Sequence, residues 1–294
     1  MAVTVRGIDV SKWQGNVDMK KVKAAGYTFV ILNAGFGKYI SQKDPFFEQN
    51  YTNAKSAGLG VGVYWYSYAK TVSDAAQEAA VCLQAISGKQ FEYPIFYDFE
   101  DSTQASLSSS VVSSIINKFC STLENKGYYV GVYSMVSWLG TKIPSSICKK
   151  YDVWCAHFGV SKPAYSGAYG IWQYTSTGKV NGVKGNCDCN YAYKDYPTAI
   201  KNAGLNGFKK PSALKTLDTS GFKLGDKGNG VFAYKCLLKL AGKKGIIPVS
   251  VDDTGGFGGG TEKATNELLK KLGYKPNGIA GQKLIYKLYK LIKE

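Results

Sequence analysis

Residues 93–101, Tyr-Pro-Ile-Phe-Tyr-Asp-Phe-Glu-Asp, change abruptly from an apolar run to a group of acids. The β-branched and aromatic residues at positions 95–97 favour a strand. Because side chains alternate along a strand, Asp98 and Glu100 project from one face, about 6.6 Å apart along the chain. Folding alone gives no reason to place two carboxylates side by side after an apolar run. This stretch therefore predicts a functional site at the end of a strand.

A pair of neighbouring carboxylates suits one kind of chemistry in particular. Like charges at this distance oppose joint ionisation, so one of the two is expected to keep its proton near neutral pH. Hydrolysis of a glycosidic bond uses such a pair, an acid that protonates the leaving oxygen and a carboxylate that stabilises or attacks the sugar cation. An Asp-x-Glu motif is common by itself, so the rest of the chain decides its meaning.

The spacing of apolar runs predicts an α/β barrel. Eight runs read as strands, over residues 5–10, 29–34, 60–68, 94–99, 128–134, 153–158, 170–174 and 187–191. Helical periodicity follows the first four, over residues 17–25, 45–57, 73–87 and 106–126, and residues 135–150 have room for one or two short turns. The later gaps are too short for a full helix. Alternating strands and helices predict a parallel sheet, and eight strands predict a closed barrel of the (β/α)5β3 TIM-like type.

In such a barrel the chemistry lies at the carboxyl ends of the strands. Four acids from the first, fourth and eighth strands are expected to meet there, because strands one and eight are neighbours once the barrel closes. These candidate catalytic residues are Asp9, Asp98, Glu100 and Asp188. The candidate substrate-binding residues around them are Asn33, Tyr64, Tyr66, Trp154, Trp172 and Tyr174.

Five motifs in order along the chain carry a family resemblance. They are Gly7-Ile8-Asp9-Val10-Ser11 with Trp13-Gln14-Gly15, then residues 62–68, Asp98-Phe99-Glu100, Ile171-Trp172-Gln173-Tyr174 and Asp188-Cys189-Asn190. Together they resemble the lysozymes of glycoside hydrolase family 25, N-acetylmuramidases with a (β/α)5β3 barrel, over residues 3–206. The resemblance implies cleavage of the β-1,4 bond from N-acetylmuramic acid to N-acetylglucosamine in peptidoglycan, without cofactor or metal. It makes Glu100 the general acid and Asp98, Asp9 and Asp188 its supporting carboxylates.

The chain departs from the family pattern at two places. Asn33 stands where strand two often ends in a basic residue, and Cys187 and Cys189 replace the aliphatic residues beside Asp188. The catalytic route also stays open. A direct nucleophile needs carboxyl groups about 5–5.5 Å apart and an inverting enzyme about 6.5–9.5 Å, whereas the substrate's own N-acetyl group is a third nucleophile, which Asp98 and Tyr64 would hold.

Several other residues are expected to have structural roles. Asp101 reads as a strand-end or capping residue, and His157 as the partner of a local hydrogen bond rather than a metal ligand. The seven scattered cysteines read as buried thiols, and a metal site at Cys187 and Cys189 lacks further ligands nearby. Trp13 suits either the rim of a pocket or packing.

A second, all-α domain is expected after the barrel. Residues 1–206 form the barrel domain, residues 207–218 read as a linker, and residues 219–294 contain three helical stretches over 229–241, 261–272 and 282–292. The last stretch alternates apolar residues with lysines, which favours a face packed in a small bundle over a partner or membrane helix. The spacing of Leu224-Gly225-Asp226, Asp253, Gly256-Phe257-Gly258 and Asn277-Gly278 resembles the three-helix peptidoglycan-binding domain, which implies wall targeting.

Charge and hydropathy limit the partners. The chain of 294 residues has a net charge of +16, of which residues 207–294 carry +10 from 17 basic and 7 acidic side chains. These lysines are spread along helices rather than clustered with aromatic residues, so an anionic wall polymer is favoured over nucleic acid. No apolar run reaches the length of a membrane span, and residues 1–9 lack the features of a signal peptide.

These observations favour a phage endolysin, made in the host cytoplasm and acting on the wall after release. A bacterial or prophage autolysin, another wall N-acetylhexosaminidase or chitin hydrolase, and a non-catalytic wall lectin are the alternatives. The intact set of four acids argues against the lectin. The sequence leaves the host, the wall chemotype and the oligomeric state open.

Overall fold

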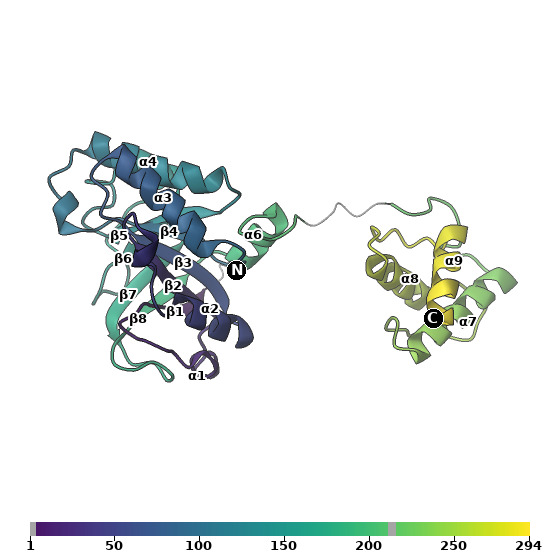
Figure 1. The fold of residues 1–294 in the computed structure, drawn as a ribbon. Coiled ribbons are helices and arrows are strands. Elements are labelled where there is room, and N and C mark those ends of the chain that lie inside the picture. Colours follow the sequence, from purple (N-terminus) through teal and green to yellow (C-terminus); the bar gives the residue numbers. More distant parts are fainter. Residues whose placement is uncertain (1–3, 211–215) are drawn as a thin grey trace. The chain divides into compact units, whose positions relative to one another are not determined.

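The computed structural model describes residues 4–210 and 216–294 (Figure 1). Contacts within the chain divide it into two compact units, one ending at Pro211 and the other beginning at Ser212. Residues 211–215 of the predicted linker lie outside the described residues. In the two described ranges, no helix has the length and apolar character needed to cross a membrane.

The first unit is a closed eight-stranded barrel, as predicted, in which each strand pairs with the next and the last returns to the first. Its strands are β1 Val5–Val10, β2 Phe29–Phe36, β3 Gly60–Tyr66, β4 Ile95–Asp98, β5 Val130–Met135, β6 Asp152–Ala156, β7 Ile171–Gly178 and β8 Cys187–Ala192. Strands β1 to β7 run parallel, but β8 is antiparallel to both of its neighbours. The short β7–β8 connection explains this, since a parallel crossover needs about a dozen residues or more.

Helices cover the outside of the barrel between consecutive strands (Figure 1). They are α1 Met19–Ala24, α2 Phe47–Ser56, α3 Val72–Ile86, α4 Ser109–Glu124 and α5 Ser145–Lys150. A sixth helix, α6 Tyr196–Ala203, follows β8 and was not predicted. The sequence does carry the usual start and stop residues of a helix here. Asp195 accepts from the Thr198 N–H at the start, and Gly204 ends the helix with a φ of 70°.

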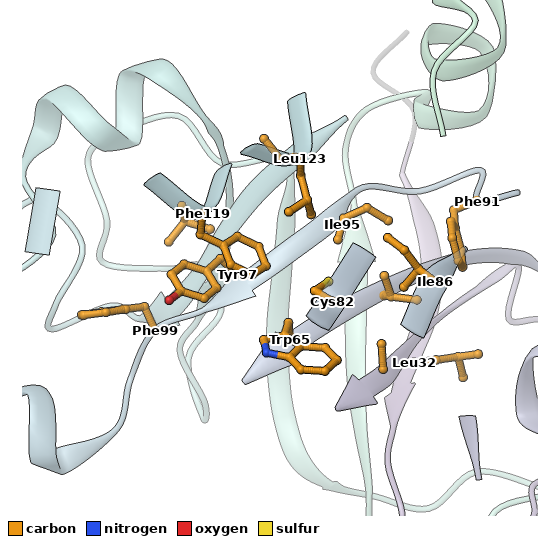
Figure 2. Packing of buried hydrophobic residues seen from close by; sticks show 14 of the residues in the cluster. Leu32, Trp65, Cys82, Ile86, Phe91, Ile95, Tyr97, Phe99, Phe119 and Leu123 are labelled. Carbon is orange, nitrogen blue, oxygen red and sulfur yellow. The ribbon is translucent and has the colours of Figure 1, made fainter. Parts of the chain in front are cut away.

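The core of this unit lies between the barrel wall and its helices. Figure 2 shows Tyr97 of β4 beside Phe119 of α4, with the two ring centroids 3.8 Å apart. Tyr97 and Phe99 belong to this outer cluster, whereas Phe96 belongs to a second cluster inside the barrel. The alternation of a strand therefore turns Asp98 toward the barrel interior, as the sequence predicted.

Strand β2 runs two residues further than predicted because it contains a β-bulge. Its register with β3 shifts between Asn33 and Gly35, and Gly35 has a φ of 148°, a conformation that favours glycine. A Cβ at this position would also lie 2.7 Å from the ring of Trp65. The bulge carries β2 on to Phe36 at the carboxyl end of the barrel.

The second unit is a small bundle of three helices, α7 Asn229–Lys243, α8 Gly259–Lys271 and α9 Gln282–Lys293. Leu284 and Leu288 of α9 are fully buried with residues of the other two helices, so the last helix packs its apolar face in the bundle as predicted. Lys235 is also buried, and its ammonium donates to the carbonyls of Thr254 and Gly256 at 2.9 Å each.

The boundaries of the predicted linker need correction at both ends. Gln90 donates to the carbonyl of Gly207 at 3.0 Å, and Phe208 packs with the barrel, so residues 207–210 belong to the first unit. Leu217 is in the core of the second unit, and the Asp218 carboxylate accepts from the Leu284 N–H at 3.0 Å. The sequence pattern showed only where helical periodicity stops. The long-range contacts of residues 207–210 and 217–218 show which unit each end of the predicted linker belongs to.

Candidate active site

A cleft of about 720 Å³ opens at the end of the barrel where the parallel strands finish. The four predicted acids line it, from strands far apart in the sequence. The structure also places there four of the predicted substrate-binding residues, namely Asn33, Tyr64, Tyr66 and Trp154.

Asp9 and Asp188 face each other across the β1–β8 pair. Directly opposed residues of an antiparallel pair have Cβ atoms about 4.5–5.5 Å apart, so the two carboxyl groups are close. Asp188 reaches the cleft from near the start of β8, not from its carboxyl end as the argument from an all-parallel sheet assumed. The antiparallel direction of β8 brings its first residues to the end of the barrel where the other strands finish.

Asp98 is the last residue of β4, and Glu100 follows the strand rather than lying in it. The backbone between them is nevertheless fixed. The Phe99 N–H donates to the Tyr133 carbonyl at 3.0 Å, and the Ser134 hydroxyl donates to the Phe99 carbonyl at 2.7 Å. With the Phe99 ring fully buried, these contacts hold Glu100 at the mouth of the barrel.

Two side-chain amides hold Asp9 in place. Gln173 Nε2 and Asn190 Nδ2 donate to Asp9 Oδ2 at 2.9 and 2.8 Å. The orientation of each amide is set from behind, since Tyr133 donates to Gln173 Oε1 and Trp154 Nε1 donates to Asn190 Oδ1, both at 2.8 Å. Because Tyr133 and Trp154 donate to the two amide oxygens, the NH2 group of each amide is the end that points at Asp9.

The electrostatics of the cleft favour protonated carboxyl groups. Burial raises the pKa of Glu100 to about 7, with smaller contributions from the charges of Asp188 and Asp101. Burial also raises the pKa of Asp188 to about 6. The pKa of Asp98 lies well above its usual range because the group is buried, with Glu100 and Asp9 nearby, and its Oδ1 has no hydrogen-bond partner among the described residues.

Asp9 has a similarly perturbed environment. Burial, followed by the charge of Asp188, raises its pKa well above the usual range, while the bonds from Asn190 and Gln173 act in the opposite direction. Near neutral pH the cleft therefore combines carboxyl groups that hold a proton with Asp188, whose pKa of about 6 lets it carry charge. Separated pKa values of this kind identify acid and base partners.

The prediction that Trp172 and Tyr174 line the cleft was wrong. Strand alternation turns Gln173 inward, so its two neighbours lie on the outer face of β7. Trp172 Nε1 donates to the His157 carbonyl at 2.8 Å, and Tyr174 stacks on Tyr191 with ring centroids 4.6 Å apart.

Other residues of the cleft were missed. Tyr133, Met135, Phe158 and Gln173 line it, and all but Met135 lie within strands already predicted. Every second side chain of a strand faces the barrel interior, so applying this alternation to each predicted strand would have identified Tyr133 and Gln173. At the rim, Trp13 is 82% exposed, with the Lys12 ammonium 5.1 Å from its ring.

The expected structural roles of Asp101 and His157 are confirmed. Asp101 accepts from the Thr103 N–H at 2.9 Å, as the N-terminal cap of the short 3-10 helix Ser102–Gln104 that follows β4, and from the Tyr66 hydroxyl at 3.1 Å. His157 Nδ1 accepts from the Ala164 N–H at 3.0 Å.

The cysteines are free thiols, and six of the seven are buried as predicted. Cys187 and Cys189 lie on the outer face of β8, away from the acids. The prediction was wrong for Cys236, which is exposed on α7. Within residues 4–210 and 216–294, no three His, Cys, Asp or Glu side chains form a group able to hold a metal ion.

A barrel whose end gathers four carboxylates between aromatic walls is the arrangement expected of a glycoside hydrolase. Residues 8–183 match the family model of the glycosyl hydrolases family 25, and the chain belongs to this family. The chain is 34% identical over 184 residues to the autolytic lysozyme of Clostridium acetobutylicum, a match that covers 63% of this chain and 54% of that protein. It thus spans about half the length of that relative. Lysozyme M1 of Streptomyces globisporus is 33% identical over 198 residues, covering 63% and 67% of the two chains.

Solved structures agree with the fold. The bacterial lysozyme of Streptomyces coelicolor superposes with a TM-score of 0.60 at 30% identity, over 68% of this chain and 96% of that one. The autolysin LytC of Streptococcus pneumoniae, solved with a synthetic peptidoglycan ligand, gives 0.56 at 30% identity over 65% and 47%. The CTP1L endolysin resembles 98% of this chain, with a TM-score of 0.59 over 99% of its own, but at 22% identity this is a likeness of fold alone.

Proposed function

We propose that this protein is an N-acetylmuramidase that hydrolyses the β-1,4 bond between N-acetylmuramic acid and N-acetylglucosamine in bacterial peptidoglycan. The observation that carries the proposal is Glu100, a carboxyl with a pKa of about 7 in a cleft that also holds Asp9, Asp98 and Asp188. Membership of family 25, the lysozymes among the relatives and the peptidoglycan ligand of LytC support it.

Glu100 acts as the general acid. Its raised pKa leaves a substantial protonated fraction near neutral pH, so it can donate a proton to the glycosidic oxygen as the bond breaks. Positive charge then develops at the anomeric carbon. Asp9 and Asp188 are opposed across the β1–β8 pair, and the negative charge that this pair carries once one of the two is ionised stabilises it.

Asp98 suits a substrate-assisted route. A buried carboxyl oxygen without a partner costs free energy until a donor arrives, and the N–H of the substrate's N-acetyl group is such a donor. Held by Asp98 and Tyr64, the acetyl oxygen would attack the anomeric carbon. A glycosyl ester found on Glu100 or on one of the three aspartates by mass spectrometry of a trapped digest would exclude this route.

We further propose that the protein is of the endolysin type, with residues 219–294 binding the cell wall, and that it reaches the wall after synthesis in a host cytoplasm. The +10 charge of residues 207–294 favours attachment to an anionic wall. A bacterial autolysin is the second candidate, favoured by the similarity to the autolytic lysozyme.

The test is the identity of the sugar ends produced from purified peptidoglycan. The digest is reduced and analysed by mass spectrometry beside a Glu100→Gln variant. Reduced muramic acid ends, absent with the variant, are expected. Reduced glucosamine ends would assign the cut to the other bond, and no new ends despite wall binding would leave a wall lectin.

A further inference from the structure

Glu78 of α3 is a buried acid that takes no part in the chemistry of the cleft. The residue is 1% exposed, and none of the salt bridges among the described residues includes it. Burial raises the pKa of Glu78, while hydrogen bonds from the Tyr97 hydroxyl and the Tyr68 N–H act in the opposite direction. Burying a carboxyl group without a cationic partner costs free energy, so packing of α3 on the barrel does not account for an acid here.

The two oxygens of Glu78 each accept a hydrogen bond. The Tyr68 N–H donates to Oε1 at 2.9 Å, and the Tyr97 hydroxyl donates to Oε2 at 2.6 Å. Both partners are donors, and an ionised carboxylate accepts at both of its oxygens. A glutamine would turn its NH2 group toward one of the two donors. These contacts therefore favour an acid over an amide at position 78.

Tyr97 connects Glu78 to the β3–α3 loop, residues 67–71, through Ser67. The Ser67 hydroxyl donates to the Tyr97 hydroxyl at 2.8 Å and accepts from the Ala69 N–H and from Gln104 Nε2, both at 3.1 Å. Gln104 Nε2 also donates to the Ala69 carbonyl at 3.0 Å. Ser67 and Gln104 are fully buried. Hydrogen bonds shielded from water thus join the start of this loop to α3, to β4 and to the 3-10 helix after β4.

The residues on either side of Ser67, Tyr66 and Tyr68, line the cleft with ring centroids 5.1 Å apart. Tyr68 is 47% exposed, so packing alone does not fix it, whereas the bond from its N–H to Glu78 does. The Tyr66 hydroxyl donates to the Asp101 carboxylate at 3.1 Å, and the Asp101 N–H donates to Gln104 Oε1 at 3.2 Å. The network therefore reaches both members of this tyrosine pair.

Other bonds hold the acids of the cleft. Glu100 is placed by the bonds of Phe99 to β5, and Asp9 by its two amide donors. The Ser67 N–H donates to the Asp98 carbonyl at 2.9 Å, a backbone bond that does not involve Glu78. Loss of Glu78 would therefore loosen the tyrosine pair and leave the acids in place.

We propose that Glu78 is a positioning residue for substrate binding, which holds Tyr66 and Tyr68 in the arrangement that receives the sugar chain. Aromatic rings stack on sugar faces, and side chains that are already ordered lose less conformational entropy when the ligand binds. The inference rests on the proposed function, because the sugar chain is the substrate of the proposed reaction. A residue that acts in this way affects KM and not kcat, since it contributes equally to binding of the substrate and of the transition state.

The test measures kcat and KM of the full-length chain on soluble peptidoglycan fragments. Glu78→Leu removes both acceptors with little change in volume and is expected to raise KM about tenfold, because two tyrosine side chains must then be ordered on binding. Glu78→Gln keeps one oxygen for the Tyr68 N–H and should raise KM by about threefold. In both variants kcat is expected to stay within about twofold of the parent.

Tyr97→Phe removes the hydroxyl that connects Glu78 to Ser67 and keeps the buried ring. It should raise KM as Glu78→Gln does, and adding it to Glu78→Leu should raise KM no further, because the two residues act through one network. If Glu78→Leu does not fold, Glu78→Gln and Tyr97→Phe decide the test. Melting curves establish that each variant is folded at the temperature of the assay.

Asp152→Leu is the matched control for a buried acid. The Asp152 side chain is 3% exposed and accepts from the Tyr129 hydroxyl at 3.0 Å and the Lys194 ammonium at 2.9 Å. It is the first residue of β6, at the end of the barrel away from the cleft. Asp152→Leu should lower the melting temperature and leave KM and kcat within about twofold of the parent.

Three results would overturn the inference: an unchanged KM in Glu78→Gln and Tyr97→Phe, a fall in kcat at constant KM, or a rise in KM as large for Asp152→Leu. The two proposals fail in different ways. Cleavage of the muramic acid bond with an unchanged KM in the variants refutes the role of Glu78 alone. Cleavage of another bond refutes the muramidase alone, because KM is then compared on that substrate, and for a parent that binds without cleaving, Kd takes the place of KM.

Discussion

Replacing Glu100 with glutamine should stabilise the barrel while abolishing cleavage. Burial raises the pKa of Glu100 from its ordinary 4.5 to about 7. A folded-state pKa above the unfolded value means that ionisation in the folded barrel costs free energy, which appears as the pH rises from 4.5 through 7. At 1.36 kcal/mol per pKa unit, the full penalty is about 3 kcal/mol. A glutamine side chain at this position has no charge to bury, so we expect a gain of about 2–3 kcal/mol at pH 8 and little change at pH 4.

Urea unfolding followed by tryptophan fluorescence measures this effect in the barrel alone, because all five tryptophans lie in the first unit. The quantity compared is the difference in unfolding free energy between variant and parent, from pH 4 to pH 8. Glu124→Gln, an exposed acid at the end of α4, is the matched control and should change stability by less than about 0.5 kcal/mol. A difference that stays constant across this pH range, or a less stable Glu100→Gln at pH 8, would contradict the reasoning.

Two further substitutions, one in each unit, test the hydrogen bonds that hold Asp9 and the Lys235 site. Gln173→Met removes one of the two amide donors to Asp9, so the pKa of Asp9 rises further, and the acidic limb of the kcat/KM profile should move to higher pH. An unshifted limb would show that ionised Asp9 is not required. Lys235→Met leaves the Thr254 and Gly256 carbonyls without their donor and should destabilise the second unit by about 2–3 kcal/mol. Far-UV circular dichroism should then melt earlier while the tryptophan transition stays in place, and a coincident shift of both would mean that the units unfold together.

The pH behaviour of the whole cleft follows from the same electrostatics. Asp9, Asp98, Glu100 and Asp188 all have raised pKa values, each with burial as the largest cause. Stability from these groups is therefore greatest at low pH and is lost as they ionise. A carboxyl group with a pKa near neutrality, as for Glu100 at about 7 and Asp188 at about 6, can both donate and accept a proton at neutral pH.

Much of the barrel could be predicted from local pattern. Alternation at Phe96, Tyr97 and Asp98 identified which side chains face the helices and which face the interior, because the period of a strand is a property of the backbone. The helices between strands followed from apolar period and from their ends. The α6 helix was missed although Asp195 and Gly204 mark its ends, since short helices carry few periodic positions.

The tertiary structure decided what local pattern leaves open. Strand β8 runs antiparallel, and this direction alone brings Asp188 opposite Asp9. The register of β7 turns Gln173 into the cleft and Trp172 out of it, and the bonds from Tyr133 and Trp154 through two amides to Asp9 join residues far apart in the chain. The sequence by itself determined the elements and the acids, because these depend on neighbouring residues. The direction of a strand, the side chains that it turns into the cleft and their hydrogen-bond partners depend on closure of the whole barrel, which no local stretch encodes.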